Sequence, residues 1–248
     1  EILQRAKLVT LPPQAPEIRL ATEAESAAIP APFFSPPPLL DGHGERGVFV
    51  LPTRFSLDPA KRLDDFSFEA ASWWLYAHEG RPGHELQYAS MVARKLTVAR
   101  AVFAFTNANV EGWGLYAEDL LRPYMPPAAQ LACLQARLMR AAHAFLDIEL
   151  NLGRIDTNEA HRVLHDEAAF SEAWTEQSIA RYTYRLPAQA PSYFYGYRAL
   201  LTLRNEVMRA EGSRFDPRSF HDFLLEQGLV SPKILREAFF RDYLRRFP

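Results

Sequence analysis

Residues 73–87, WWLYAHEGRPGHELQ, hold the side chains best suited to metal chemistry. His78 and Glu79 form the first half of the H-E-x-x-H zinc signature, in which two histidines at i and i+4 share one helix face. Here the i+4 position is Pro82, and the next histidine is His84 at i+6. In a straight α-helix a six-residue interval points two side chains about 120° apart, so a straight helix could not aim both imidazoles at one ion.

The residues between the two histidines predict a kink or bulge. Pro82 has no N–H to donate to the carbonyl of residue 78, and its ring clashes with that carbonyl. Gly80 and Gly83 tolerate backbone angles that other residues avoid. We therefore predict that His78 and His84 approach one point. The alternative is a helix–turn–helix corner with a surface histidine on each side.

A second group of candidates lies in residues 109–119, NVEGWGLYAED. Glu111 and Glu118 are seven residues apart, so one helix face carries both carboxylates. Glu111 stands beside Gly112 and Trp113 rather than in a run of charges, and it is the candidate for a third ligand from a neighbouring helix. For Glu118, a place on the acidic surface of an amphipathic helix is an equally good interpretation.

Together, HEGRPGHELQ and EGWGLYAED resemble the "domain of unknown function 885" family of proposed zinc metallopeptidases, whose C-terminal halves carry HE-x-x-PGH-x-LQ and then EGW-x-LY-x-E. The segments FFSPPPLLDGHGERGVFVLPT, LDIELNLGRIDTNEA, RYTYRLPAQAPSYFYGYRALLTLR and FDPRSFHDFLLEQGLVSPKIL extend the resemblance over residues 30–240. Two positions depart from the family pattern. Glu85 replaces a histidine that usually follows PGH, which puts the second metal ligand in doubt, and Ala188 replaces a glycine.

The resemblance and the residue types together favour a mostly helical hydrolase with one zinc ion that acts on peptides. His78, His84 and Glu111 would hold the ion and leave its fourth position open, as in catalytic zinc sites. Glu79 would be the general base. Glu85 is not expected to be a ligand, because seven helical residues displace it by about 10.5 Å along the axis from His78. A non-catalytic member that binds peptides or a partner protein, and a zinc hydrolase of another amide or an ester, are the alternatives.

The segment SYFYGYRALLTLR predicts the other wall of the active site. Tyr193, Tyr197 and Arg204 follow one another at intervals of four and seven, so one helix face presents all three. One of the tyrosines would donate a hydrogen bond to the developing oxyanion. Arg204 would anchor a substrate carboxylate or orient Glu111. The alternative is that the tyrosines pack in the core and the arginine pairs with a surface carboxylate.

The remaining histidines have simpler interpretations. His161 and His165 are at i and i+4, but we expect a solvated helix face. His143 and Asp147 favour a structural hydrogen-bonded pair, and the resemblance makes the aspartate a candidate support for the metal site. His221 is expected to cap or pack a late helix.

The elements that must position these residues are mostly helices. The pattern predicts helices at about 67–80, 83–98, 100–122, 127–153, 156–168, 171–183, 191–211, 216–227 and 231–245. Starts are indicated at Asp156, Asp216 and Ser231, and ends at Gly153, Gly212 and Gly228. Residues 1–40 predict an extended, proline-rich entry segment, and one or two short β-strands are expected near residues 45–55. We predict one helical catalytic-type domain over residues 1–248.

Composition argues against several other classes of protein. The 248 residues carry a formal net charge of −2, which argues against a nucleic-acid binder that relies on bulk positive charge. A single cysteine, Cys133, excludes an intrachain disulfide framework. No run approaches the roughly 18 apolar residues of a membrane span. The chain begins at Glu1 inside a helix-like run, so we expect that a natural N-terminal part is missing. The compartment, cytoplasmic or exported, and the oligomeric state stay open.

Overall fold

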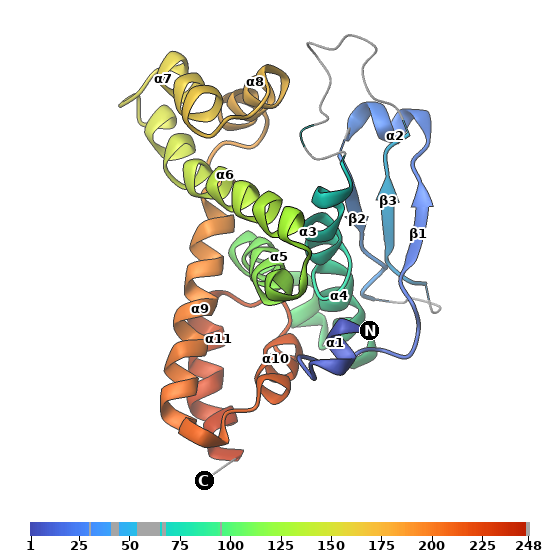
Figure 1. Cartoon of the computed structure of the whole chain (residues 1–248). Helices are drawn as coiled ribbons and strands as arrows, with labels where there is room; N and C mark the ends of the chain where they lie inside the picture. Colours follow the sequence, from blue (N-terminus) through green and yellow to red (C-terminus); the bar gives the residue numbers. More distant parts are fainter. Residues whose placement is uncertain (30, 41–44, 54–64, 66–67, 95, 247–248) are drawn as a thin grey trace.

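In a computed structural model, residues 1–29, 31–40, 45–53, 65, 68–94 and 96–246 are described, and they form a mostly helical fold with a small sheet (Figure 1). The predicted fold class is confirmed. Within the described residues, no helix is long and apolar enough to cross a membrane.

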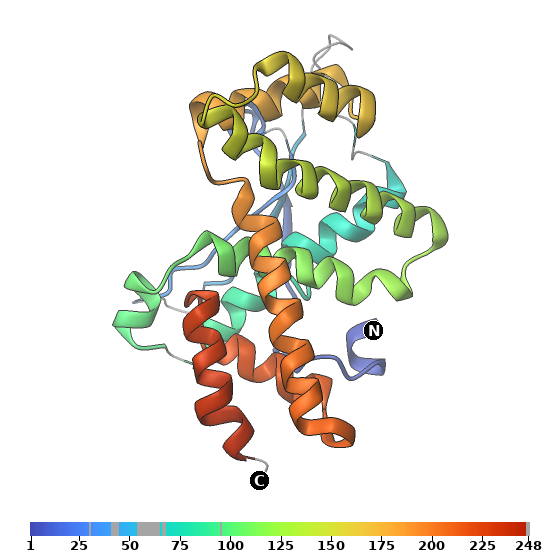
Figure 2. The same ribbon diagram turned by 90° about the vertical axis from the view of Figure 1, so that its left-hand side faces the viewer.

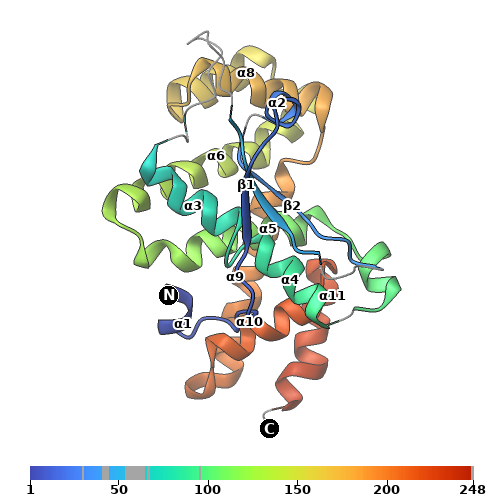
Figure 3. The same ribbon diagram turned by 90° about the vertical axis from the view of Figure 1, so that its right-hand side faces the viewer.

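The N-terminal part forms a three-stranded sheet on one side of the helices (Figure 3). Its elements are α1 (Ile2–Arg5), β1 (Glu17–Leu20), α2 (Glu23–Ala28), β2 (Phe33–Ser35) and β3 (Val48–Leu51). Strand β3 lies in the middle, parallel to β1 and antiparallel to β2. The strand expected near residues 45–55 is therefore β3, although residues 54 and 55 lie outside the described part of the chain. The expected extended entry segment contains two further strands and two short helices, a difference from the prediction.

The helices follow in chain order. They are α3 (Glu69–Glu79), α4 (His84–Arg94), α5 (Asn107–Leu121), α6 (Pro127–Asn151), α7 (Thr157–His161), α8 (Glu172–Ala180), α9 (Pro191–Glu211), α10 (Pro217–Glu226) and α11 (Pro232–Ala238). Single π turns connect or extend them at η2 (Ala99–Phe103), η4 (Arg162–Glu167), η5 (Arg181–Arg185) and η7 (Phe239–Tyr243), and 3-10 turns form η3 (Arg122–Tyr124), η6 (Gly212–Arg214) and η8 (Leu244–Arg246). The single helix expected at 100–122 is wrong, because the side chain of Thr106 caps a new helix, α5, and accepts a hydrogen bond from the Asn109 N–H.

The predicted start and stop signals act as expected. The three start residues each accept a hydrogen bond from a backbone N–H in the first turn of their helix: Asp156 from Glu159, Asp216 from Ser219 and Ser231 from Ile234. The three glycines at helix ends all have positive φ: Gly153 (65°), Gly212 (58°) and Gly228 (69°). These local signals divide the chain into helices of the predicted order and approximate length.

Helix α5 lies at the centre, and α9 crosses it (Figures 1 and 2). The two backbones touch at Gly112 and Gly196. A Cβ at Gly196 would lie 1.8 Å from the carbonyl oxygen of Ala108, so only glycine allows this approach. The main apolar core surrounds this contact and includes Trp113, Tyr116 and Tyr197. Because α5 is packed so closely, the residues on its other face are held at fixed positions.

Candidate metal centre

The centre begins at the break between α3 and α4. Helix α3 ends at Glu79 and α4 begins at His84. A Cβ at Gly83 would lie 1.8 Å from the carbonyl oxygen of His78, so the tight path of the chain here requires glycine. The indole Nε1 of Trp113 donates to the carbonyls of Pro82 (2.9 Å) and Gly83 (3.1 Å). The break is thus fastened to the central helix.

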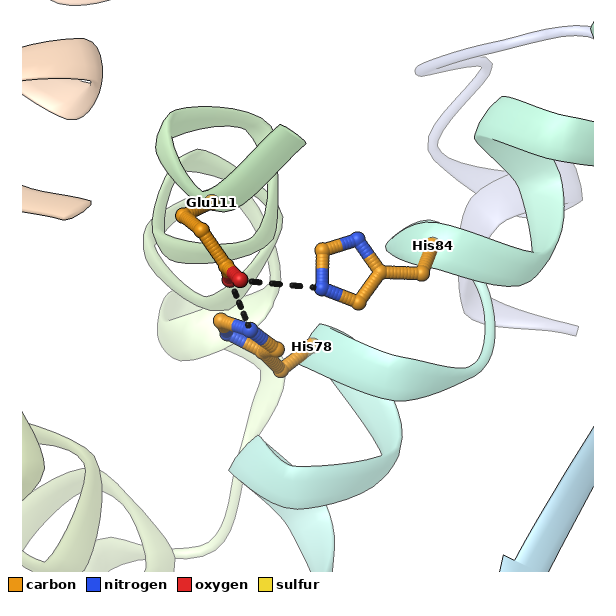
Figure 4. A group of neighbouring side chains, drawn as sticks. All are labelled: His78, His84 and Glu111. Atoms are coloured by element: carbon orange, nitrogen blue, oxygen red, sulfur yellow. Dashed lines mark ion pairs between the residues drawn. The ribbon is translucent and has the colours of Figure 1, made fainter. Parts of the chain in front are cut away.

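The structure brings the three predicted metal ligands together (Figure 4). Oε2 of Glu111 lies 3.5 Å from His78 Nε2 and 3.6 Å from His84 Nε2. The two imidazole rings are 4.7 Å apart between centroids and almost perpendicular, at 87°. One ligand atom from each residue lies within 4.8 Å of the other two. Two donors on a tetrahedral zinc ion are about 3.4 Å apart, so this spacing fits the ion. We call these three residues the metal cradle.

A second carboxylate supports the cradle from behind. Glu118 Oε1 lies 2.7 Å from His78 Nδ1, and only 3% of the Glu118 side chain is exposed. A carboxylate on the remote nitrogen of a metal-binding histidine orients the ring and makes it a better ligand. The interpretation of Glu118 as a surface residue is therefore wrong. The seven-residue spacing did place it on the same face as Glu111, but that face points inward.

The charges in the cradle are strongly coupled. Burial disfavours the charged form of His78, but its contacts with Glu111 and Glu118 outweigh burial and raise the pKa of the imidazole. Burial likewise disfavours the Glu111 carboxylate, but the neighbouring His78 and His84 lower its pKa below the usual range. At neutral pH the metal-free cradle therefore holds an imidazolium between two carboxylates. The positive charge of the protonated His78 ring balances the carboxylates, as a bound metal ion would.

The two glutamates that flank the break have different surroundings. Glu79, the last residue of α3, accepts a hydrogen bond at Oε2 from the Phe34 N–H of β2 (3.0 Å). Its carboxylate is thereby held at the edge of the sheet. Glu85 is buried and forms a bidentate ion pair with Arg81, which also donates to the carbonyl of Gln14. The structure places Glu85 with this guanidinium and outside the metal cradle.

A cavity of about 580 Å³ opens beside the cradle. His78, Glu79 and Tyr193 line one part of it. The other lining residues are mostly apolar, with two arginines and a histidine among them: Ala31, Pro32, Phe49, Leu51, Pro52, Phe68, Glu69, Ser72, Trp74, Leu75, Tyr76, Met139, Arg140, His143, Trp174 and Arg181. Its volume and mixed lining are typical of sites for small ligands or short peptide segments.

Of the three residues predicted on α9, only Tyr193 lines the cavity. Its ring stacks 6.2 Å from that of His78. The hydroxyl of Tyr197 instead donates to Asp119 (3.0 Å). Arg204 is close enough to His221 to contribute, after burial, to lowering the pKa of that imidazole.

The prediction that Tyr197 and Arg204 line the site is therefore corrected. The three residues do share a helix face, but a helix rises 1.5 Å per residue, and Arg204 is displaced by about 16 Å along the axis from Tyr193. Only the first turns of α9 reach the cavity.

Sequence reasoning missed the two arginines at the cavity. Arg140 lies 3.5 Å from Glu118, with its guanidinium 4.9 Å above the ring of Trp74. Arg181 donates to the hydroxyl of Tyr193 (3.1 Å). A signal for Arg181 was present, because it opens the RYTYRLPAQ segment that carries part of the family resemblance.

The other histidine clusters have structural surroundings. Asp147 does not bond His143 but accepts hydrogen bonds from the backbone N–H groups of Ala188 (2.8 Å) and Ala190 (3.0 Å), and so fixes the turn before α9. His221 is buried between the hydroxyl of Tyr116 and the carbonyl of Leu8. His161 lies near Glu172 and Glu176. Both carboxylates of this second group are exposed, unlike the ligands of the cradle.

Comparison with known proteins identifies the fold. The family described as "Bacterial protein of unknown function (DUF885)" matches residues 1–239. A proposed lipoprotein of unknown function from Shewanella oneidensis has a similar structure, with a TM-score of 0.83 and 22% identity over 97% of this chain and 43% of the other. A proposed lipoprotein from Colwellia psychrerythraea gives a TM-score of 0.81 and 26% identity over 98% of this chain and 40% of the other. No curated protein matches the chain. The chain spans about two fifths of the length of these two solved structures.

Proposed function

The chain belongs to the DUF885 family of bacterial proteins of unknown function, and we propose that it is a zinc-dependent hydrolase that cleaves peptide bonds. The observation that carries this proposal is the cradle of two buried histidines, His78 and His84, and the partly buried Glu111, whose ligand atoms lie within 4.8 Å of one another beside a cavity. Glu118 behind His78 completes a carboxylate–histidine pair that is typical of zinc sites.

The donor set fits zinc and fits a catalytic site. Two imidazoles and one carboxylate are the ligands of many catalytic zinc ions, which keep a fourth position for water or substrate. When bound, zinc supplies a Lewis acid that lowers the pKa of water and polarises a carbonyl group. His78, His84 and Glu111 would hold the ion.

The protein's own residues supply the proton transfer. Glu79 lies next to a ligand and lines the cavity, and the Phe34 N–H holds its carboxylate in place. We assign it the role of general base, which takes a proton from the attacking water and passes it to the leaving amine.

We assign Tyr193 the role of stabilising the oxyanion that develops on the carbonyl. Burial and the nearby Glu111 carboxylate raise the pKa of Tyr193 to about 12, so the phenol keeps its proton at neutral pH. Its oxygen accepts a hydrogen bond from Arg181, an arrangement that leaves the proton to be donated. A phenol of this kind is a suitable oxyanion donor in a site that excludes water.

The test measures zinc content and turnover in the same preparations. We expect about one zinc per chain by elemental analysis and cleavage of a mixed peptide library. His84→Ala should lose both. His161→Ala, which removes the half-buried histidine at the end of α7, outside the cavity lining, is the control and should lose neither.

Glu79→Gln separates the base from the ligands. It should retain zinc and lower turnover by about 100-fold or more, the usual scale for general acid–base catalysis. Zinc binding with no cleavage of peptides would favour a binding protein of the same fold. Cleavage of esters or other amides alone would identify a zinc hydrolase that acts on bonds other than peptide bonds. A chain without zinc affinity would refute the proposal.

We also propose that the protein is exported from the cytoplasm. The two solved structures named above are described as proposed lipoproteins, which favours export of the present protein to the cell surface or periplasm. Peptides that reach that compartment would be the substrates. Fractionation of cells that express the natural gene, followed by detection of the protein, tests this part separately.

A further inference from the structure

Arg181 is a half-buried cation at the cavity, and its hydrogen-bond partners among the described residues are neutral groups. It donates to the side-chain oxygen of Gln189 and to the hydroxyl of Tyr193. Its Nε atom is buried without a hydrogen-bond partner. None of the ion pairs among the described residues includes Arg181. Shielding a guanidinium from water without a carboxylate in contact is costly, so this position is suited to an anion that arrives with a ligand.

The neighbouring arginine is a useful contrast. Arg140 lies on the same cavity, but its guanidinium is matched by the Glu118 carboxylate at 3.5 Å. The third basic side chain, His143, is buried, and burial together with the two arginines lowers its pKa well below the usual value, so it is neutral. Arg181 is thus the arginine of the described cavity lining that forms no ion pair with a carboxylate of the described residues, and the more distant Glu111 carboxylate favours its charge.

We propose that Arg181 binds the C-terminal carboxylate of a peptide substrate, so that the hydrolase removes a short fragment from the C-terminus. This inference rests on the proposed function, because it places the carboxylate relative to the metal cradle. A guanidinium binds a carboxylate through two parallel N–H···O bonds and thereby fixes its orientation as well as its position.

The distance between Arg181 and the cradle sets the fragment length. Tyr193 contacts both, with its ring centroid 5.5 Å from Cζ of Arg181 and 6.2 Å from the ring of His78, so the two groups are at most about the sum of these distances apart. An extended peptide spans about 3.3–3.6 Å per residue, so at most about three residues fit between a carbonyl at the cradle and a carboxylate at Arg181. The products would be single amino acids, dipeptides or tripeptides.

The cavity walls indicate which C-terminal residues fit. Trp74, Leu75, Met139 and Trp174 line it, with Phe49 from the sheet. A large apolar side chain would bury its surface against them, at roughly 25 cal/mol per Å². We therefore expect peptides that end in leucine or phenylalanine to be preferred over those that end in lysine or glycine.

A side-chain carboxylate offers the same chemistry as a terminal one, so the test includes both. The probes are three N-acetylated penta-alanine peptides extended by one residue: phenylalanine with a free carboxylate, phenylalanine as the amide, and glutamate as the amide. Binding is measured by calorimetry on the zinc-loaded Glu79→Gln variant, which keeps the peptide intact. Cleavage of the same peptides is measured on the unaltered protein.

We expect the free carboxylate to improve binding about 10- to 100-fold over the amide, the scale of a hydrogen bond to a charged group. Arg181→Gln in the Glu79→Gln background should abolish this preference. Arg185→Gln, which removes an exposed arginine from the same η5 turn, is the matched control and should leave it unchanged. Thermal unfolding of each variant checks that the fold is retained.

Equal binding of the free peptide and its amide would overturn the inference, and so would a preference that survives Arg181→Gln. Tighter binding of the glutamate amide than of the free carboxylate would assign Arg181 to an acidic side chain and also overturn it. If the carboxylate preference depends on Arg181 but no peptide is cleaved, the role of Arg181 in binding the C-terminal carboxylate stands and the proposed catalytic function fails.

Discussion

Replacement of Glu118 by glutamine tests whether the metal site depends on the carboxylate behind it. Glu118 lies 2.7 Å from His78 Nδ1, and both side chains are at least 95% buried. The amide oxygen of glutamine can still accept the Nδ1 hydrogen, so the ring keeps its orientation but loses a negative neighbour. We expect the zinc affinity to fall while the fold is preserved.

The size of the loss follows from two opposing effects. Loss of such an outer carboxylate typically weakens metal affinity by 10- to 100-fold. The same carboxylate also raises the pKa of His78 and so helps a proton to compete with the metal. Because glutamine relieves that competition, we expect a loss at the lower end, about 10-fold, or about 1.4 kcal/mol. Glu118→Ala, which also frees the ring to turn and leaves Arg140 without its carboxylate, should cost about 100-fold.

The assay is competition with a chromophoric zinc chelator at pH 7.5, on protein first stripped of metal. Asp119→Asn is the matched control, because it removes the carboxylate of the next residue on α5, which contacts Tyr197 and Arg137 but no cradle residue. Its zinc affinity should change less than threefold. If Glu118→Gln binds zinc as tightly as this control does, the role assigned to Glu118 is wrong.

Two further predictions concern packing and acid stability. Gly114→Ala would place a Cβ 2.4 Å from Cε1 of His78, so the imidazole ring must shift. We expect at least a 10-fold loss of zinc affinity in the same chelator assay. An unchanged affinity would show that the position of the ring is not critical. His221 is buried, and burial lowers its pKa to about 4, so the unfolded chain takes up a proton from about pH 6.5 downward before the folded protein does. Stability should therefore fall as the pH drops through this range, by about 2 kcal/mol at pH 5.0 from this residue. Urea unfolding at pH 7.5 and 5.0 measures the loss, and a pH dependence unchanged in His221→Gln would contradict the assignment.

The sequence predicted those features that depend on a few neighbouring residues. The capping residues Asp156, Asp216 and Ser231 start helices where expected, and the glycines and proline between His78 and His84 do break the helix. Spacing along one helix also placed Glu111 and Glu118 on a common face.

The errors concern features that depend on how segments distant in sequence pack together. Residue spacing shows which side chains share a helix face, but it does not show which turns of the helix reach the site. Tyr197 and Arg204 were therefore grouped with Tyr193, although they lie further along α9. Residue spacing also could not show that α6 and the η5 turn bring Arg140 and Arg181 to the same cavity, because that depends on packing between segments distant in sequence. The strands β1 and β2 were missed because their proline-rich surroundings suggested only extended chain.

The attachment of Trp113 to the break between α3 and α4 has a consequence for how the metal and the fold depend on each other. An ion held by His78, His84 and Glu111 would act as a cross-link that closes two loops in the chain. A cross-link stabilises a protein mainly by reducing the freedom of the unfolded chain and of parts that would otherwise move. Here the indole hydrogen bonds, the required Gly83 and the His78–Glu118 contact already hold the three ligands without an ion. Zinc would therefore enter a preorganised site, and its removal should leave the helices in place, unlike in small zinc domains that unfold without metal.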